Sequence, residues 1–263
     1  MSRNHKDTLT VIDKQTLELR PVSIPVPGHG IASLATDGAG HLFAEPVDPM
    51  VSDDIYPVGG TTVIDVTTGE VVSFPDDPSR DVFRDVMVGA DGTAWFAGDD
   101  GGLFRYDPET TALDFSEGVL SASLRASTRP AADGTIYGVT EEPYSFFAFA
   151  PDGTVRDDLG KPRSYATSLA LVPDESAFLY VPGAHGHSQA FNTPVISVDT
   201  ATGEQAVLAE LYDLAKAELG LVLGGTYSIT IDAERNQAHI AFNAGPTDDE
   251  PWGEVVLVVL DLP

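Results

Sequence analysis

The chain has 263 residues, of which 42% are hydrophobic, and it contains 25 glycines, 19 prolines and no cysteine. This composition indicates a folded chain with many turns, and it excludes a disulfide framework, a thiolate site and a largely disordered protein. The formal net charge of −27, from 41 acidic against 14 basic residues, argues against nucleic acid and anionic membrane surfaces as partners.

The chain contains no apolar run that approaches about eighteen residues, the length that marks a membrane helix. Its first residues, MSRNHKDTLTVID, lack the apolar core of a secretory signal. We therefore expect a cytoplasmic protein that has no membrane partner. The length favours a single domain, 1–263. The many carboxylates suit either a solubilising surface or the binding of cations.

One unit recurs along the chain: a β-rich run, a tight turn, a second run, a variable loop, a third run with its own turn, and a fourth run. The first turns are TDGAG (36–40), ADGT (90–93), ADGT (132–135), PDES (173–176) and DAERN (232–236). The third runs end in turns such as TVIDVTTGE (62–70) and VISVDTATGE (195–204). Asp-Gly pairs supply the positive backbone angles of tight hairpins, so each unit is predicted to be a four-stranded antiparallel sheet.

These units resemble the YVTN and NHL-type repeats of β-propeller proteins, and DGTAWFAGDDGGLFRYDPET (91–110) resembles a blade of the streptogramin lyase-like propellers. The predicted fold is all-β: a β-propeller of about five four-stranded blades, or an open arc of a larger one. Full blades are predicted at 31–78, 82–120, 124–162 and 164–222. A composite blade would join 226–262 to 8–25. A partner chain, in a homo- or hetero-oligomer, could complete an open arc.

One segment departs from the strand pattern. LAELYDLAKAEL (208–219) places Leu208, Leu211, Tyr212, Ala215 and Leu219 at helical spacing, and Gly220 follows where a helix would end. We expect a short amphipathic helix here, in the link to the last blade.

The loops between second and third strands are long and varied, whereas the turns at the other end of each sheet are short. This contrast predicts that function lies on the long-loop side. That side carries three histidines and ten acids: His29, His185, His187, Glu45, Asp53, Asp54, Asp99, Asp100, Glu141, Glu142, Asp248, Asp249 and Glu250.

A divalent-metal site is one hypothesis for these residues, with His29, His185, His187, Glu45 and Asp248 as candidate ligands. Imidazole with carboxylate suits Zn, Fe, Mn or Cu, and carboxylates without imidazole suit Ca or Mg, so the sequence does not distinguish the metal. The alternative is that the histidines bond to backbone carbonyls and stabilise a long loop.

Further candidates for ligand binding are two arginines near the starts of innermost strands, Arg84 and Arg125, and three aromatic residues, Tyr144, Tyr165 and Trp252. In so acidic a chain an inward arginine must be paired, either with a carboxylate of the protein or with an anionic ligand. The loop aromatics could stack on a small molecule or pack their loops down.

Two functions remain open. The first is a ligand- or partner-binding propeller module with an acidic, histidine-containing loop face. The second, implied by the resemblance to streptogramin lyase-like propellers, is a divalent-metal-assisted lyase or hydrolase in which His185 or His187 acts as the base. The sequence contains no P-loop, no GxSxG elbow and no HExxH motif, which argues against phosphoryl transfer, serine hydrolysis and zincin chemistry.

Overall fold

The computed structural model describes residues 8–13, 15–23, 30–36, 40–48, 56–57, 62–74, 85–97, 101–184 and 186–263. Two compact units make up the chain, Met1–Leu124 and Arg125–Pro263, and each is described by itself. Both units are built from antiparallel sheets, so the predicted all-β class is confirmed. The assignment of all residues to one domain, and the composite blade, stay predictions.

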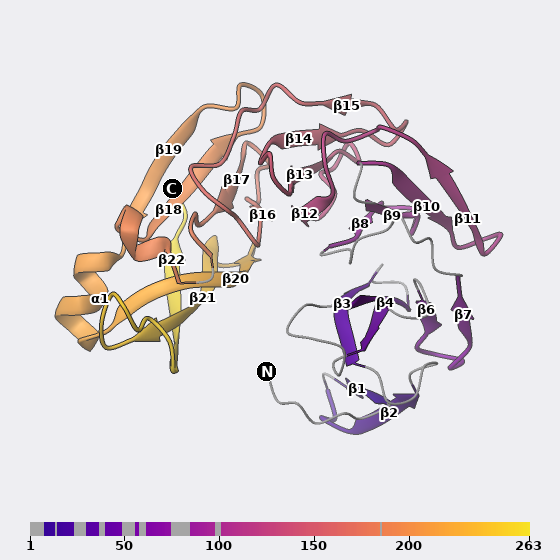
Figure 1. Ribbon diagram of the computed structural model, residues 1–263, viewed down its shortest axis with the longest axis horizontal. Coiled ribbons are helices and arrows are strands. Elements are labelled where there is room, and N and C mark those ends of the chain that lie inside the picture. Colours follow the sequence, from indigo (N-terminus) through magenta and orange to yellow (C-terminus); the bar gives the residue numbers. More distant parts are fainter. Residues whose placement is uncertain are drawn as a thin grey trace. The chain divides into compact units, whose positions relative to one another are not determined.

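The first unit contains a two-stranded hairpin and two larger sheets (Figure 1). The hairpin pairs β1 (Thr8–Ile12) with β2 (Leu19–Ser23). The next sheet has the order β3 (Gly30–Thr36), β4 (His41–Asp48), β6 (Thr62–Asp65), β7 (Val71–Ser73), with β5 (Tyr56–Pro57) added beside β4. The third sheet contains β8 (Met87–Val88), β9 (Ala94–Ala97), β10 (Leu103–Asp107) and β11 (Ala112–Ser116).

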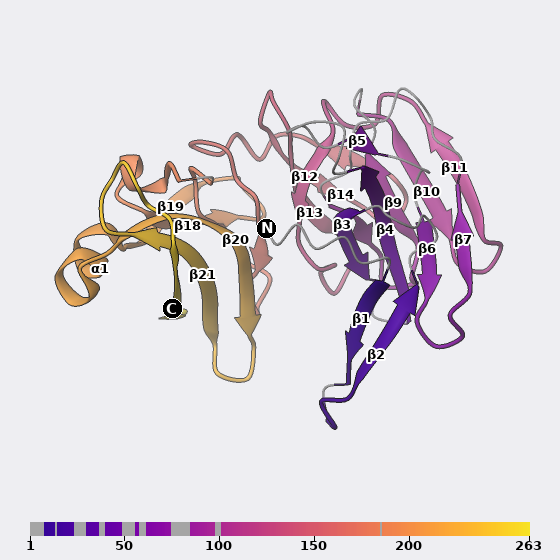
Figure 2. The ribbon, with the colours of Figure 1, turned by 60° about the horizontal axis from the view of Figure 1, so that its bottom comes forward.

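The second unit contains three sheets in which consecutive strands are neighbours. Its first sheet is β12 (Leu124–Ser127), β13 (Ile136–Thr140), β14 (Phe146–Phe149) and β15 (Val155–Arg156). The second is β16 (Ala170–Leu171), β17 (Ala177–Tyr180), β18 (Pro194–Asp199) and β19 (Gln205–Glu210). The third is β20 (Val222–Asp232), β21 (Gln237–Gly245) and β22 (Glu254–Asp261), and Figure 2 shows its long β20–β21 hairpin.

The recurring Asp-x-x-Thr-Gly-Glu turns have one physical basis. The Asp199 carboxylate accepts hydrogen bonds from the backbone N–H groups of Ala201 (3.0 Å) and Thr202 (2.7 Å). Gly203 then takes a φ of 75°, which a residue without Cβ adopts without strain. The turn after β6 repeats this geometry with Asp65 and Gly69. These bonds stabilise the ionised form, so the pKa of the Asp199 carboxyl lies below its usual value.

Successive side chains of a strand point to opposite faces of its sheet, and this places aromatic residues between neighbouring sheets. In the second unit Phe146 of β14 meets Phe178 of β17 edge to face, with ring centroids 5.1 Å apart, and it meets Tyr180 at 5.2 Å. All three rings are fully buried. Burying a side chain of this size contributes about 1.5–3 kcal/mol, so this cluster fixes how the β12–β15 sheet faces the β16–β19 sheet.

The expected helix over 208–219 is shorter than its spacing predicts. The α-helix α1 spans Tyr212–Leu219 and ends at Gly220, which has a φ of 69°. The expectation is wrong for Leu208, which lies in β19 because Gln205–Glu210 pairs with β18. Leu211 and Ala215 do pack into the core beside β20–β22. No helix in the parts of the chain that the structure describes is long and apolar enough to span a bilayer.

Candidate functional site

The long loops of the second unit contact one another in series. In each of its antiparallel sheets the turns β12–β13 and β14–β15, and their equivalents, lie at one end, and the longer loops lie at the other. The long-loop end carries 141–145 between β13 and β14, 181–193 between β17 and β18, and 246–253 between β21 and β22. The link between β15 and β16 reaches the same end with Tyr165.

Arg125, Glu141, Tyr144 and Tyr165 form a cluster at this end, which we call the Arg125 cluster. Arg125, on β12, is only 7% exposed. Its Nη1 lies 3.2 Å from Oε1 of Glu141, and its Cζ lies 4.3 Å from the centroid of the Tyr165 ring. The arginine is therefore held by a carboxylate on one side and an aromatic face on another. Arg125 Nε is buried and has no hydrogen-bond partner among the described residues.

Tyr144 extends this cluster towards solvent. Its ring meets the Tyr165 ring at a centroid distance of 5.7 Å and an angle of 64°. Burial raises the pKa of the Tyr144 hydroxyl, and the neighbouring carboxylates of Glu142 and Glu141 raise it further. Glu142 is exposed beside it. The arrangement thus presents a positioned aromatic ring next to an exposed carboxylate, a combination that attracts cationic groups.

The loop 181–193 joins this cluster to the loop 246–253. The backbone N–H of Gly183 donates to the Tyr165 carbonyl at 2.9 Å. Trp252 lies against Gly186 so closely that a Cβ there would stand 2.1 Å from Cζ2 of the indole. Gln189 donates from Nε2 to the Asp248 carbonyl at 3.0 Å. Trp252 therefore packs its loop down, although 45% of its surface stays exposed.

Asp248 links its loop to the helix α1 through its carboxylate. Its two carboxylate oxygens lie 2.8 and 3.0 Å from the Tyr212 hydroxyl, and Lys216 Nζ lies 3.5 Å from Oδ1. Lys216 also donates to the Tyr212 hydroxyl, and this bond, together with the Asp248 charge, raises the pKa of the lysine. The contact ties the loop 246–253 to α1.

The predicted metal site is only partly covered by the structure. His29, His185 and Arg84 lie outside the described residues, as does the side chain of Glu45. His187 is exposed and precedes the short 3₁₀ helix η1 (Ser188–Phe191), with its backbone N–H bonded to the Gly183 carbonyl at 2.9 Å. Where the structure describes side chains, it contains no group of three His, Asp or Glu residues that could hold a metal.

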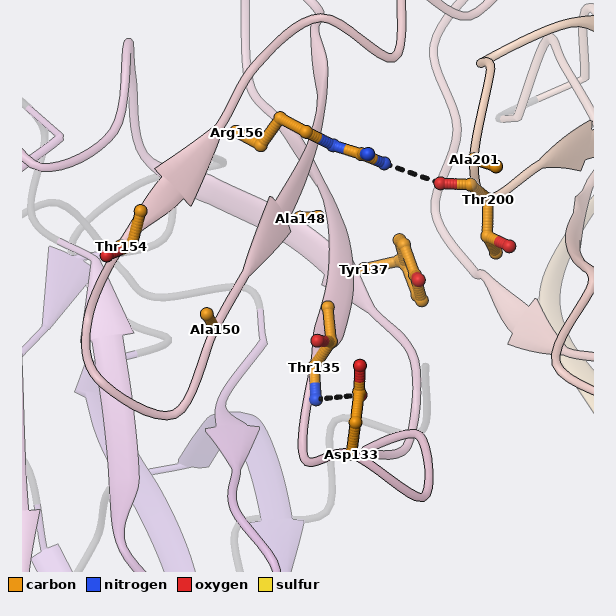
Figure 3. Close-up of a pocket in the computed structure, with 9 residues that line it drawn as sticks. All are labelled: Asp133, Thr135, Tyr137, Ala148, Ala150, Thr154, Arg156, Thr200 and Ala201. Atoms are coloured by element: carbon orange, nitrogen blue, oxygen red, sulfur yellow. Dashed lines mark hydrogen bonds between the residues drawn. The ribbon is translucent and has the colours of Figure 1, made fainter.

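A hollow of ≈ 370 Å³ lies at the opposite, short-turn end of the second unit (Figure 3). Its lining residues are Asp133, Thr135, Tyr137, Ala148, Ala150, Thr154, Arg156, Thr200 and Ala201. Arg156 spans it by donating to the Thr200 carbonyl, and the Asp133 carboxylate accepts from the Thr135 N–H at 2.9 Å. The hollow depends on small residues of two neighbouring sheets, and nothing in their spacing marks them as a site.

Comparison with known structures decides the fold. A quinonprotein alcohol dehydrogenase-like protein from Bacteroides thetaiotaomicron superposes with a TM-score of 0.62 at 12% identity, over 96% of this chain and 57% of its own. A chain of a nidogen/laminin complex gives 0.58 at 12% identity, over 89% and 83%. A chain of the mitotic checkpoint complex gives 0.63 at 8%, over 90% and 67%.

These neighbours are β-propeller proteins, and their blades are four-stranded antiparallel sheets like those found here. The chain has a β-propeller fold. The predicted fold is thereby confirmed, and the sheets described above are its blades. At 8–12% identity the likeness shows the fold and nothing of the activity.

The chain spans 57% of the length of the Bacteroides protein. No family model matches the sequence, and no curated protein matches it significantly.

Proposed function

We propose that this β-propeller is a binding module whose long-loop side, in the second unit, recognises cationic side chains of a partner. The observation that carries the proposal is the Arg125 cluster, where a partly buried ion pair and two contacting tyrosine rings lie beside the exposed carboxylate of Glu142. Arg125 is already paired with Glu141, so it positions the cluster and does not serve as the anchor of an anionic ligand.

The charge of the loops and of the whole chain also favours a cationic partner. The loops 141–145 and 246–253 contain five acids and no lysine or arginine. A partner with lysine or arginine side chains would be steered to this side by the field of a chain with net charge −27. A cation seated on the Tyr144 ring next to Glu142 would gain about 0.5–1 kcal/mol from the ring, and a comparable amount from the carboxylate.

The test uses hexaarginine and hexalysine peptides as probes, titrated calorimetrically. We expect Glu142→Gln and Tyr144→Ala each to weaken binding about two- to fivefold, in line with one exposed ion pair or one cation–π contact. Glu234→Gln, on the β20–β21 turn, is the matched control because it removes the same charge from an exposed site at the short-turn end of a different blade. Equal weakening by the control would mean that only net charge attracts the peptides.

The divalent-metal-assisted lyase or hydrolase, with His185 or His187 as the base, stays a prediction, and His185 lies outside the described residues. No contact described above favours it, because His187 is exposed and the Asp248 carboxylate is bonded to Tyr212. Elemental analysis of the purified protein tests it. A stoichiometric transition metal that is lost from a His185→Ala, His187→Ala double variant would support the enzyme, and a metal-free protein would refute it.

A further inference from the structure

The contacts of Arg125 show how this long-loop side holds a guanidinium group. The Cζ atom of Arg125 lies 4.3 Å from the centroid of the Tyr165 ring, and its Nη1 lies 3.2 Å from Oε1 of Glu141. The planar group thus lies over a ring and at the same time donates to a carboxylate. We call these three residues, all of the second unit, the internal triad.

A second tyrosine and a second glutamate lie directly beside the internal triad. Glu142 follows Glu141 in the chain, and the Tyr144 ring meets the Tyr165 ring at a centroid distance of 5.7 Å. Glu142 is exposed and Tyr144 is half-buried. Burial raises the pKa of the Tyr144 hydroxyl, and the charge of Glu142 raises it more than that of Glu141 does, so the Glu142 carboxylate lies near this phenol. Within the described residues no cation lies over the Tyr144 ring.

The other cations of the second unit do not pair with Glu142. Four of them form ion pairs with other carboxylates: Arg129 with Glu175, Arg156 with Asp158, Lys216 with Asp248 and Arg235 with Asp232. Lys161 and Arg163 form no ion pair in the part of the chain that the structure describes. The Glu142 carboxylate and the Tyr144 ring are therefore available to a cation of a partner.

We propose that an arginine side chain of the partner lies over the Tyr144 ring and pairs with Glu142, as Arg125 does in the internal triad. The inference rests on the proposed cation-binding function and specifies the cation. A guanidinium satisfies a ring face and a carboxylate together because it is flat and donates along its edge, whereas the ammonium of lysine is a compact, strongly hydrated charge. The contact with Tyr165 positions the Tyr144 ring before the partner binds, which lowers the entropy lost on binding. The site is therefore expected to select arginine over lysine.

The ratio of the affinities for hexaarginine and hexalysine, titrated calorimetrically at equal ionic strength, tests this selection. The two peptides carry equal side-chain charge, so attraction by net charge acts on both alike. In the double variant Glu142→Gln, Tyr144→Leu we expect hexaarginine to bind about 20-fold more weakly and hexalysine about fourfold more weakly, so that the preference for arginine falls about fivefold. Tyr144→Phe, which keeps the ring, should retain more of the preference than Tyr144→Leu.

Two single variants complete the design. Glu142→Gln changes one exposed side chain without loss of volume, and it should lower the preference for arginine about twofold. Glu234→Gln removes the same charge from an exposed turn of a different blade and should leave the preference unchanged. Equal weakening of both peptides by the double variant, or an equal fall in preference with Glu234→Gln, would overturn the selection of arginine and leave the cation-binding function standing. Unchanged binding of both peptides would overturn that function as well.

Discussion

The ion pair between Arg125 and Glu141 sets the geometry of the candidate site, so its removal should be costly. Breaking a fully buried pair by deleting one partner costs about 3–5 kcal/mol, whereas an exposed pair is worth about 0–1 kcal/mol. Arg125 is 7% exposed and the Glu141 side chain 28%, so this pair lies between these limits. We expect Glu141→Gln to lower the free energy of unfolding by about 1–3 kcal/mol.

A double variant separates the interaction energy between Arg125 and Glu141 from the contacts that each side chain makes with its other neighbours. Arg125→Met with Glu141→Gln leaves no unpaired charge, so its loss should be smaller than the sum of the two single losses by about 1–2 kcal/mol. Urea unfolding followed by Trp252 fluorescence, in a Trp95→Phe background, reports on the second unit because the chain has only 2 tryptophans. Additive single losses, within about 0.3 kcal/mol, would refute the coupling and with it the structural role assigned to Arg125.

Three further perturbations follow from the same structure. The pKa of Asp199 is lowered in the folded chain, so the ionised carboxylate stabilises the fold fully above about pH 4, and this contribution is lost as the pH falls further. The difference in Tm between wild type and Asp199→Asn should therefore shrink below that pH and stay constant above it. Gly186→Ala should shift Trp252 fluorescence and destabilise the second unit, because the new Cβ would stand 2.1 Å from the indole, whereas Gly160→Ala, with a similar φ and open space, should leave the fluorescence unchanged. Sodium chloride at about 1 M should raise Tm by screening the repulsion of a chain of net charge −27, and a fall in Tm would contradict this.

The fold could be predicted from the sequence because the same turn chemistry recurs. Asp199 and Asp65 cap their turns with their own carboxylates, and Gly203 and Gly69 supply the positive φ, so each turn is specified by residues within five positions. Spacing rules for a helix fail where hydrogen bonding to a neighbouring strand competes with the helix. Leu208 has helical spacing with Leu211, but its segment pairs with β18 and therefore belongs to the strand β19.

The candidate site could be predicted only in part. The sequence singled out Arg125, Tyr144 and Tyr165 as separate candidates for ligand binding, and the structure places their side chains next to one another. The sequence could not show which carboxylate pairs with Arg125, because Glu141 and Glu142 are adjacent and only the course of the loop decides between them. Asp248 as a metal ligand stays a prediction, and its bond to Tyr212, a partner 36 positions away, is one that no spacing rule identifies.

The central claim is that cationic groups bind at the Arg125 cluster, and chemical-shift mapping with hexaarginine tests it most directly. Backbone amide spectra of the isotope-labelled chain would be recorded during the titration. We predict that the largest shifts occur at residues 141–145 and around Tyr165. Shifts concentrated at the short-turn end, around Asp133 and Thr200, or spread evenly over the acidic surface would contradict the account.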